Sequence, residues 1–180
     1  MNQALNQINI TFNPVEDRLL LRVCATGSEP ENPAEFRMWL TRRYVRLLWA
    51  VFEKVLDDEV EKIPQYTPDN KGVIRRLQQE ADLSQADFST PYKTPDSPAT
   101  PLGEAPLLLS KIRLSKNSGN HPVLYLNTEA DKGINLTLNT QLVNSMMKLL
   151  AQTTDAAQWN LGLMSRVADT AQKPPPGMLM

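Results

Sequence analysis

The sequence has little of what most catalytic and metal-binding sites need. Its 180 residues include one cysteine, Cys24, and one histidine, His121. Transition-metal sites need several Cys, His or carboxylate ligands that converge, so we expect no metal site. Any Ser or Cys hydrolytic triad would have to use His121, which precedes Pro122 at a predicted turn. We therefore predict that the protein is not an enzyme and has no catalytic residues.

Glycine and long apolar runs are also scarce. The seven scattered glycines form neither a P-loop nor a dinucleotide-binding pattern, so no cofactor is expected. The longest apolar stretch, residues 47–52, is far shorter than the about 20 residues that span a membrane. The first residues lack the basic and apolar regions of a secretory signal, and a single cysteine fits a reducing compartment. We expect a cytoplasmic protein without a membrane segment.

Net charge is also low, at −1, and gives no whole-protein argument for nucleic-acid or membrane binding. The charge is uneven, however. Residues 57–104 hold ten acids and five bases, whereas residues 105–180 hold four acids and seven bases. The acidic stretch is also rich in proline, which predicts a long linker with a short helix near residues 72–83 and an extended, poorly ordered part over residues 87–103. A further hypothesis is that this acidic middle masks basic residues elsewhere.

What the sequence does contain is an apparent repeat on either side of this linker. Residues 36–41 alternate between apolar and polar side chains in the same way as residues 134–139, and an amphipathic helix follows each stretch. This predicts an α+β fold of two similar β-β-β-α halves, residues 1–56 and 105–152, with antiparallel sheets in one compact body. Residues 153–180 are predicted to form a C-terminal arm whose end is disordered.

Alternation and turn residues give the expected elements of each half. Strands are predicted over residues 8–13, 19–24 and 35–40, with a helix over 41–56, and then over residues 107–116, 123–127 and 134–138, with a helix over 141–151. The first helix has arginines at its start and acids after its end, against its dipole. Something must compensate these charges, or the helix ends earlier.

One binding candidate stands out, a group of arginines beside aromatic residues. The predicted nucleic-acid-binding residues are Arg37, Trp39, Arg42, Arg43 and Arg46. Strand alternation places Arg37 and Trp39 opposite the core face, and arginine beside an exposed ring suits single-stranded nucleic acid. The alternative is that Trp39 packs inside the protein while the arginines pair with the linker's acids.

The duplicated plan of three strands and a helix also resembles the Whirly and Pur-type folds, and this resemblance implies binding of single strands on a sheet. Our first prediction is nevertheless a non-catalytic binding or assembly protein that forms homodimers, or binds a protein partner, through its apolar helices. Single-stranded nucleic-acid binding is the second.

Overall fold

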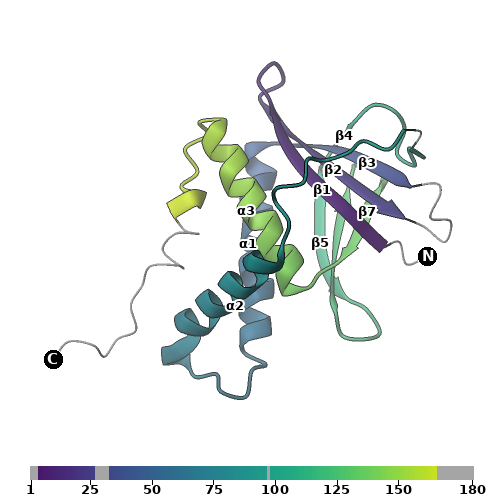
Figure 1. Cartoon of the computed structure of the whole chain (residues 1–180). Helices are drawn as coiled ribbons and strands as arrows, with labels where there is room; N and C mark the ends of the chain where they lie inside the picture. The colour runs from purple at the N-terminus through teal and green to yellow at the C-terminus, as the bar shows by residue number, and fades with distance from the viewer. Residues whose placement is uncertain (1–3, 27–32, 97, 166–180) are drawn as a thin grey trace. The chain divides into compact units, whose positions relative to one another are not determined.

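The structure is a computed structural model that describes residues 4–26, 33–96 and 98–165 (Figure 1). Within these ranges it is an α+β fold with a four-stranded sheet, a three-stranded sheet and four helices. None of the helices in the described ranges is long and apolar enough to cross a membrane. The disordered end predicted for the C-terminal arm lies outside the described residues.

The chain divides into two compact units, whereas the sequence predicts a single compact body. The described parts of residues 1–48 and 87–137 form the first unit, and those of residues 49–86 and 138–180 form the second. Both sheets belong to the first unit, and most of the helical residues belong to the second. The boundary falls within α1 (Arg42–Val60), between Leu48 and Trp49.

The first sheet has the strand order β1-β2-β3-β4. Its strands are β1 (Ala4–Asn13), β2 (Arg18–Thr26), β3 (Ala34–Leu40) and β4 (Leu107–Leu108). The first three pair antiparallel, as short connections favour, and β4 pairs parallel with β3. The core face of β2 is formed by Leu19, Leu21 and Val23, which are at most 1 % exposed.

The second sheet has the order β5-β6-β7 and is antiparallel throughout. Its strands are β5 (Lys111–Lys116), β6 (Pro122–Asn127) and β7 (Gly133–Thr137). The prediction of one lead strand over residues 107–116 is wrong. The Leu109 N–H donates to Trp39 O of β3, and the Ser110 N–H donates to Asn127 O of β6. The chain therefore changes sheets between these two residues.

The second unit contains the rest of α1 together with η1 (Pro68–Asn70), α2 (Lys71–Gln85) and α3 (Thr140–Ala156). Helix α2 covers the residues 72–83 where a short helix is predicted. Asn139 caps α3 by accepting from the Leu142 N–H at 2.7 Å. The core of this unit comes from Trp49, Phe52, Val55, Val143, Met146, Leu150 and Trp159.

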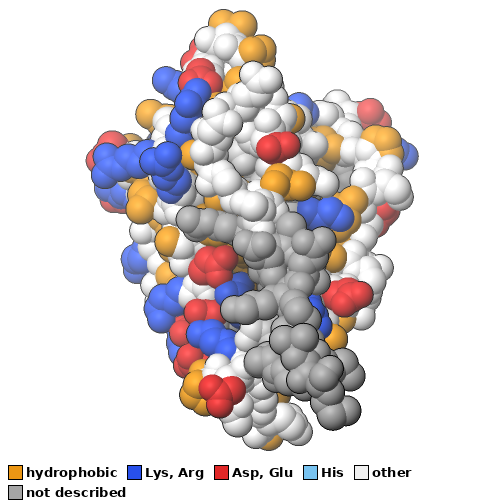
Figure 2. Space-filling model, turned by 90° about the vertical axis from the view of Figure 1, so that its left-hand side faces the viewer, with side chains coloured by type: hydrophobic (Ala, Val, Ile, Leu, Met, Phe, Trp, Pro, Cys, Tyr) orange, Lys and Arg blue, Asp and Glu red, His pale blue; other side chains and the backbone are white. Residues whose placement is uncertain are grey.

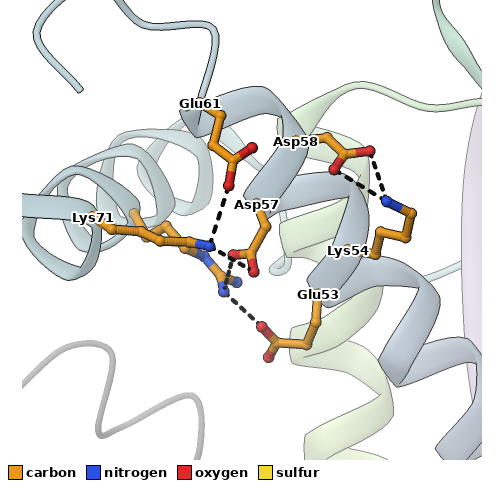
Figure 3. Close-up of polar contacts among 7 residues, drawn as sticks. Glu53, Lys54, Asp57, Asp58, Glu61 and Lys71 are labelled. Carbon is orange, nitrogen blue, oxygen red and sulfur yellow. Dashed lines mark hydrogen bonds and ion pairs between the residues drawn. The ribbon is translucent and has the colours of Figure 1, made fainter. Parts of the chain in front are cut away.

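Acidic side chains in the C-terminal part of α1 are paired with bases of α2 (Figure 3). Lys71 Nζ lies 2.9 Å from an Asp57 carboxylate oxygen, and Arg75 contacts both Glu53 and Asp57, at 2.6 and 3.0 Å. The hydrogen bond with Asp57 raises the pKa of Lys71. Bases from the acidic segment therefore neutralise the C-terminal part of α1, and the helix continues to Val60.

Candidate functional site

The five residues predicted to bind nucleic acid lie in the first unit but do not form one free basic patch. Arg37 is engaged by Glu35, with its Nη2 2.5 Å from the Glu35 carboxylate. Arg42 forms an ion pair with Asp17 at 2.8 Å. Trp39 is half-buried, and its carbonyl accepts the hydrogen bond from Leu109. Only part of the predicted set therefore remains available for a ligand.

The last two residues of the set, Arg43 and Arg46, are exposed. Within the described residues neither makes a hydrogen bond or an ion pair. They lie one helical turn apart on α1, where neighbouring side chains at this spacing share a face. Arg37 and Arg42 form ion pairs with Glu35 and Asp17, which belong to the first sheet and its hairpin turn.

The outer face of the first sheet carries a buried polar cluster that the sequence did not single out. Glu35 is only 2 % exposed, although carboxylates are rarely buried without partners. One of its oxygens accepts from Arg37 Nε at 2.6 Å, and the other accepts from the Tyr92 hydroxyl at 2.8 Å. The Arg22 guanidinium lies 5.4 Å from the centre of the Tyr92 ring. Both carboxylate oxygens of Glu35 are therefore satisfied, whereas the Nε of Arg22 is buried without a hydrogen-bond partner among the described residues.

Tyr92 belongs to an extended segment that crosses this outer face, which we call the strap (residues 87–104, with Ser97 outside the described residues). Its backbone is anchored by the Ala99 N–H, which donates to Pro33 O at 3.0 Å, and by Ala99 O, which accepts from the Glu35 N–H at 2.9 Å. The Lys93 N–H donates to Gln7 Oε1, and Glu104 O accepts from Arg37. Part of the proline-rich linker is thus bound to the sheet as an extended chain.

Burial beneath the strap changes two ionisable groups. Burial and the hydrogen bond to Glu35 raise the pKa of the Tyr92 hydroxyl above its usual range. Burial, and then the nearby Glu35 carboxylate, raise the pKa of the Cys24 thiol. Cys24 pairs directly with Glu35 across β2 and β3 and is 4 % exposed. A buried thiol with a raised pKa is a poor nucleophile.

The outer face of the second sheet is different, because its side chains are largely open to solvent. Arg113, Asn135 and Thr137 are exposed, and Tyr125 is half-buried. The Arg113 guanidinium stacks 4.0 Å from the centre of the Tyr125 ring. The sequence does not single out this pair, although the alternation of β5 and β6 places both residues opposite the buried leucines of β6. Only the strand pairing shows that they are neighbours.

Metal chemistry and charge give no second candidate. The described ranges contain no group of three or more His, Cys, Asp or Glu side chains that could hold a metal ion. On the face shown in Figure 2, outside the grey atoms, Lys and Arg side chains lie among Asp and Glu side chains. Comparison of the chain with protein-family models, curated proteins and solved structures gives no match.

Proposed function

We propose that the protein is a non-catalytic binding and assembly protein whose sheets hold extended chains. The observation that carries this proposal is the strap. Residues 87–104 are held on the first sheet by backbone hydrogen bonds at Ala99 and by the Tyr92 hydroxyl at Glu35. Backbone pairing gives affinity that is independent of sequence, and a side-chain contact such as that of Tyr92 adds selectivity.

The polar cluster supports a structural role better than a catalytic one. Both oxygens of Glu35 already accept hydrogen bonds, from Arg37 and Tyr92. A catalytic carboxylate needs an oxygen that can reach a substrate, which the strap prevents here. The single buried thiol, Cys24, is also in keeping with a protein of the reducing cytoplasm, where we place it.

Two finer points belong to the same proposal. We infer an internal duplication, because three antiparallel strands lead into a long helix twice, as β1-β2-β3-α1 and β5-β6-β7-α3.

We also propose that the protein forms a homodimer, but not by contact between the apolar stripes of its helices. Their central side chains, such as Phe52 and Met146, are fully buried in the single chain. Light scattering measures whether a dimer forms.

The proposal is tested with a labelled peptide of residues 87–104 added to the full chain. In the wild type the attached strap competes at a high effective concentration, so the peptide should bind poorly. A Tyr92→Ala/Ala99→Pro variant loses the hydroxyl contact and the Ala99 N–H, and should bind the peptide about ten-fold more tightly or better. A peptide with Ala in place of Tyr92 is the matched control. Equal binding of the peptide to both proteins would contradict the proposal.

Single-stranded nucleic-acid binding is the second candidate function. It is favoured by Arg43 and Arg46, which are exposed and have no partner within the described ranges. Phosphate contacts by such arginines make the affinity fall with salt concentration. The affinity for a single strand should therefore fall when salt is raised and when both arginines are replaced by alanine.

A further inference from the structure

The outer face of the second sheet combines planar and cationic side chains on a flat support. Cross-strand pairing aligns Arg113 of β5, Tyr125 of β6 and Asn135 of β7 in one row. Alternate residues of these strands point the other way, and Leu124 and Leu126 are fully buried. The strand backbones therefore fix the row in position, while Arg113 and Asn135 remain exposed.

The charge on this part of the chain is positive. Residues 105–137 contain the bases Lys111, Arg113, Lys116 and Lys132 and only two acids, Glu129 and Asp131. Asp131 is paired with Lys111 at 3.0 Å. Arg113 makes no ion pair with any described carboxylate, so its charge is balanced only by solvent and by the Tyr125 ring. This favours a negatively charged ligand.

We propose that the row Arg113–Tyr125–Asn135 binds single-stranded nucleic acid, which rests on the second candidate function but moves its site to the second sheet. A base stacks on the planar Arg113 guanidinium or on the Tyr125 ring. Asn135 presents an amide that can donate to and accept from a base edge. Lys111 of β5 shares this face by alternation, and its ammonium is paired with Asp131 at 3.0 Å.

The chemistry of this face separates a nucleic acid from a protein partner. Protein interfaces usually have an apolar centre. Val123 is the one aliphatic side chain among the described residues of this face. It is buried in the single chain, where only 7 % of it is exposed. The remaining side chains are polar, charged or aromatic. A polyanion with stacked rings fits this set better than a polypeptide does.

The test is a fluorescence-anisotropy titration of the full chain with labelled single-stranded DNA and RNA of about 12 nucleotides, at about 50 and about 200 mM salt. We expect Arg113→Gln and Tyr125→Ala each to lower the affinity about ten-fold. Arg113→Gln should also reduce the salt dependence by about one phosphate contact. Tyr125→Phe keeps the ring and should retain binding.

Controls separate the possible failures. The double variant Arg43→Ala/Arg46→Ala tests the predicted basic residues on α1. It removes two positive charges, one more than Arg113→Gln removes. If this variant loses binding while Arg113→Gln and Tyr125→Ala bind normally, the site on the second sheet is wrong and the second candidate function survives. If the wild type binds no single strand at either salt concentration, both are overturned. Arg113 is exposed, so Arg113→Gln should fold even if Tyr125→Ala does not.

Discussion

The two sheets share a strand plan but differ in what covers their outer faces. In the first sheet the strap lies over β2 and β3, and β4 pairs with the edge of β3. In the second sheet no described strand pairs with the outer edge of β7, and Arg113 and Asn135 are exposed. The same backbone arrangement therefore produces a closed face in one case and an open face in the other, and an added segment makes the difference.

The side chains of the two outer faces differ along with this coverage. Both outer faces pair an arginine with a tyrosine, Arg22 with Tyr92 and Arg113 with Tyr125. In the first sheet the tyrosine comes from the strap and its hydroxyl donates to the buried Glu35. In the second sheet the tyrosine belongs to the sheet itself, and none of the described side chains donates to or accepts from its hydroxyl. The first pair is thus part of the fold, and the second is available for binding.

The largest expected effect comes from removing the carboxylate of the closed face. Glu35→Ala leaves Arg37 without its carboxylate partner and Tyr92 without an acceptor. Breaking a buried ion pair costs about 3–5 kcal/mol, so the free energy of unfolding measured in urea should fall by about that amount. Glu35→Gln keeps a hydrogen-bond acceptor and should lose less. A loss no larger than that caused by Asp131→Ala, at the exposed ion pair of the second sheet, would show that the Glu35 cluster contributes little.

Opening of the closed face can be followed through Cys24, the only thiol in the chain. Tyr92→Ala removes a hydrogen bond to a charged group, worth about 1.5–3 kcal/mol, so the strap should open more often. We expect alkylation of Cys24 to become roughly ten-fold faster or more. Arg113→Ala alters the other sheet and should leave the rate unchanged. An unchanged rate in Tyr92→Ala would mean that the strap does not control access to this face.

A pH titration gives a smaller effect that is specific to the same contact. The pKa of Tyr92 is raised by burial and by Glu35 in the folded protein. Above about pH 10 the unfolded chain loses this proton while the folded chain keeps it, so stability falls as the pH rises. Tyr92→Phe cannot lose a proton. The stability difference between the wild type and Tyr92→Phe should therefore be constant below about pH 9 and should shrink by about pH 11. A constant difference over this range would contradict the raised pKa.

Part of this fold can be predicted from the sequence alone. Alternation over residues 8–13, 19–24 and 35–40 predicts β1, β2 and β3, because each strand buries one face and exposes the other. The strap could not be found in this way. Its main side-chain contact joins Tyr92 to Glu35, which are 57 residues apart, and its pairing at Ala99 uses backbone atoms that carry no sequence signal.

The switch between sheets and the candidate site show the same limit. The sequence from Leu107 to Lys116 alternates as one strand would, and only the hydrogen bonds of Leu109 and Ser110 divide it. The outward orientation of Arg113 and of Tyr125 follows from alternation. Their stacking does not, because it depends on the register between β5 and β6.

The smallest expected effect is on the open face. Arg113→Gln removes an exposed cation from the half-buried Tyr125 ring, an interaction worth about 0.5–1 kcal/mol, so the free energy of unfolding should fall by no more than this. If the loss approaches that of Glu35→Ala, Arg113 is part of the fold and the second sheet is not the open counterpart of the first. A small loss of stability together with a large loss of nucleic-acid affinity would instead show that the exposed arginine is retained for binding.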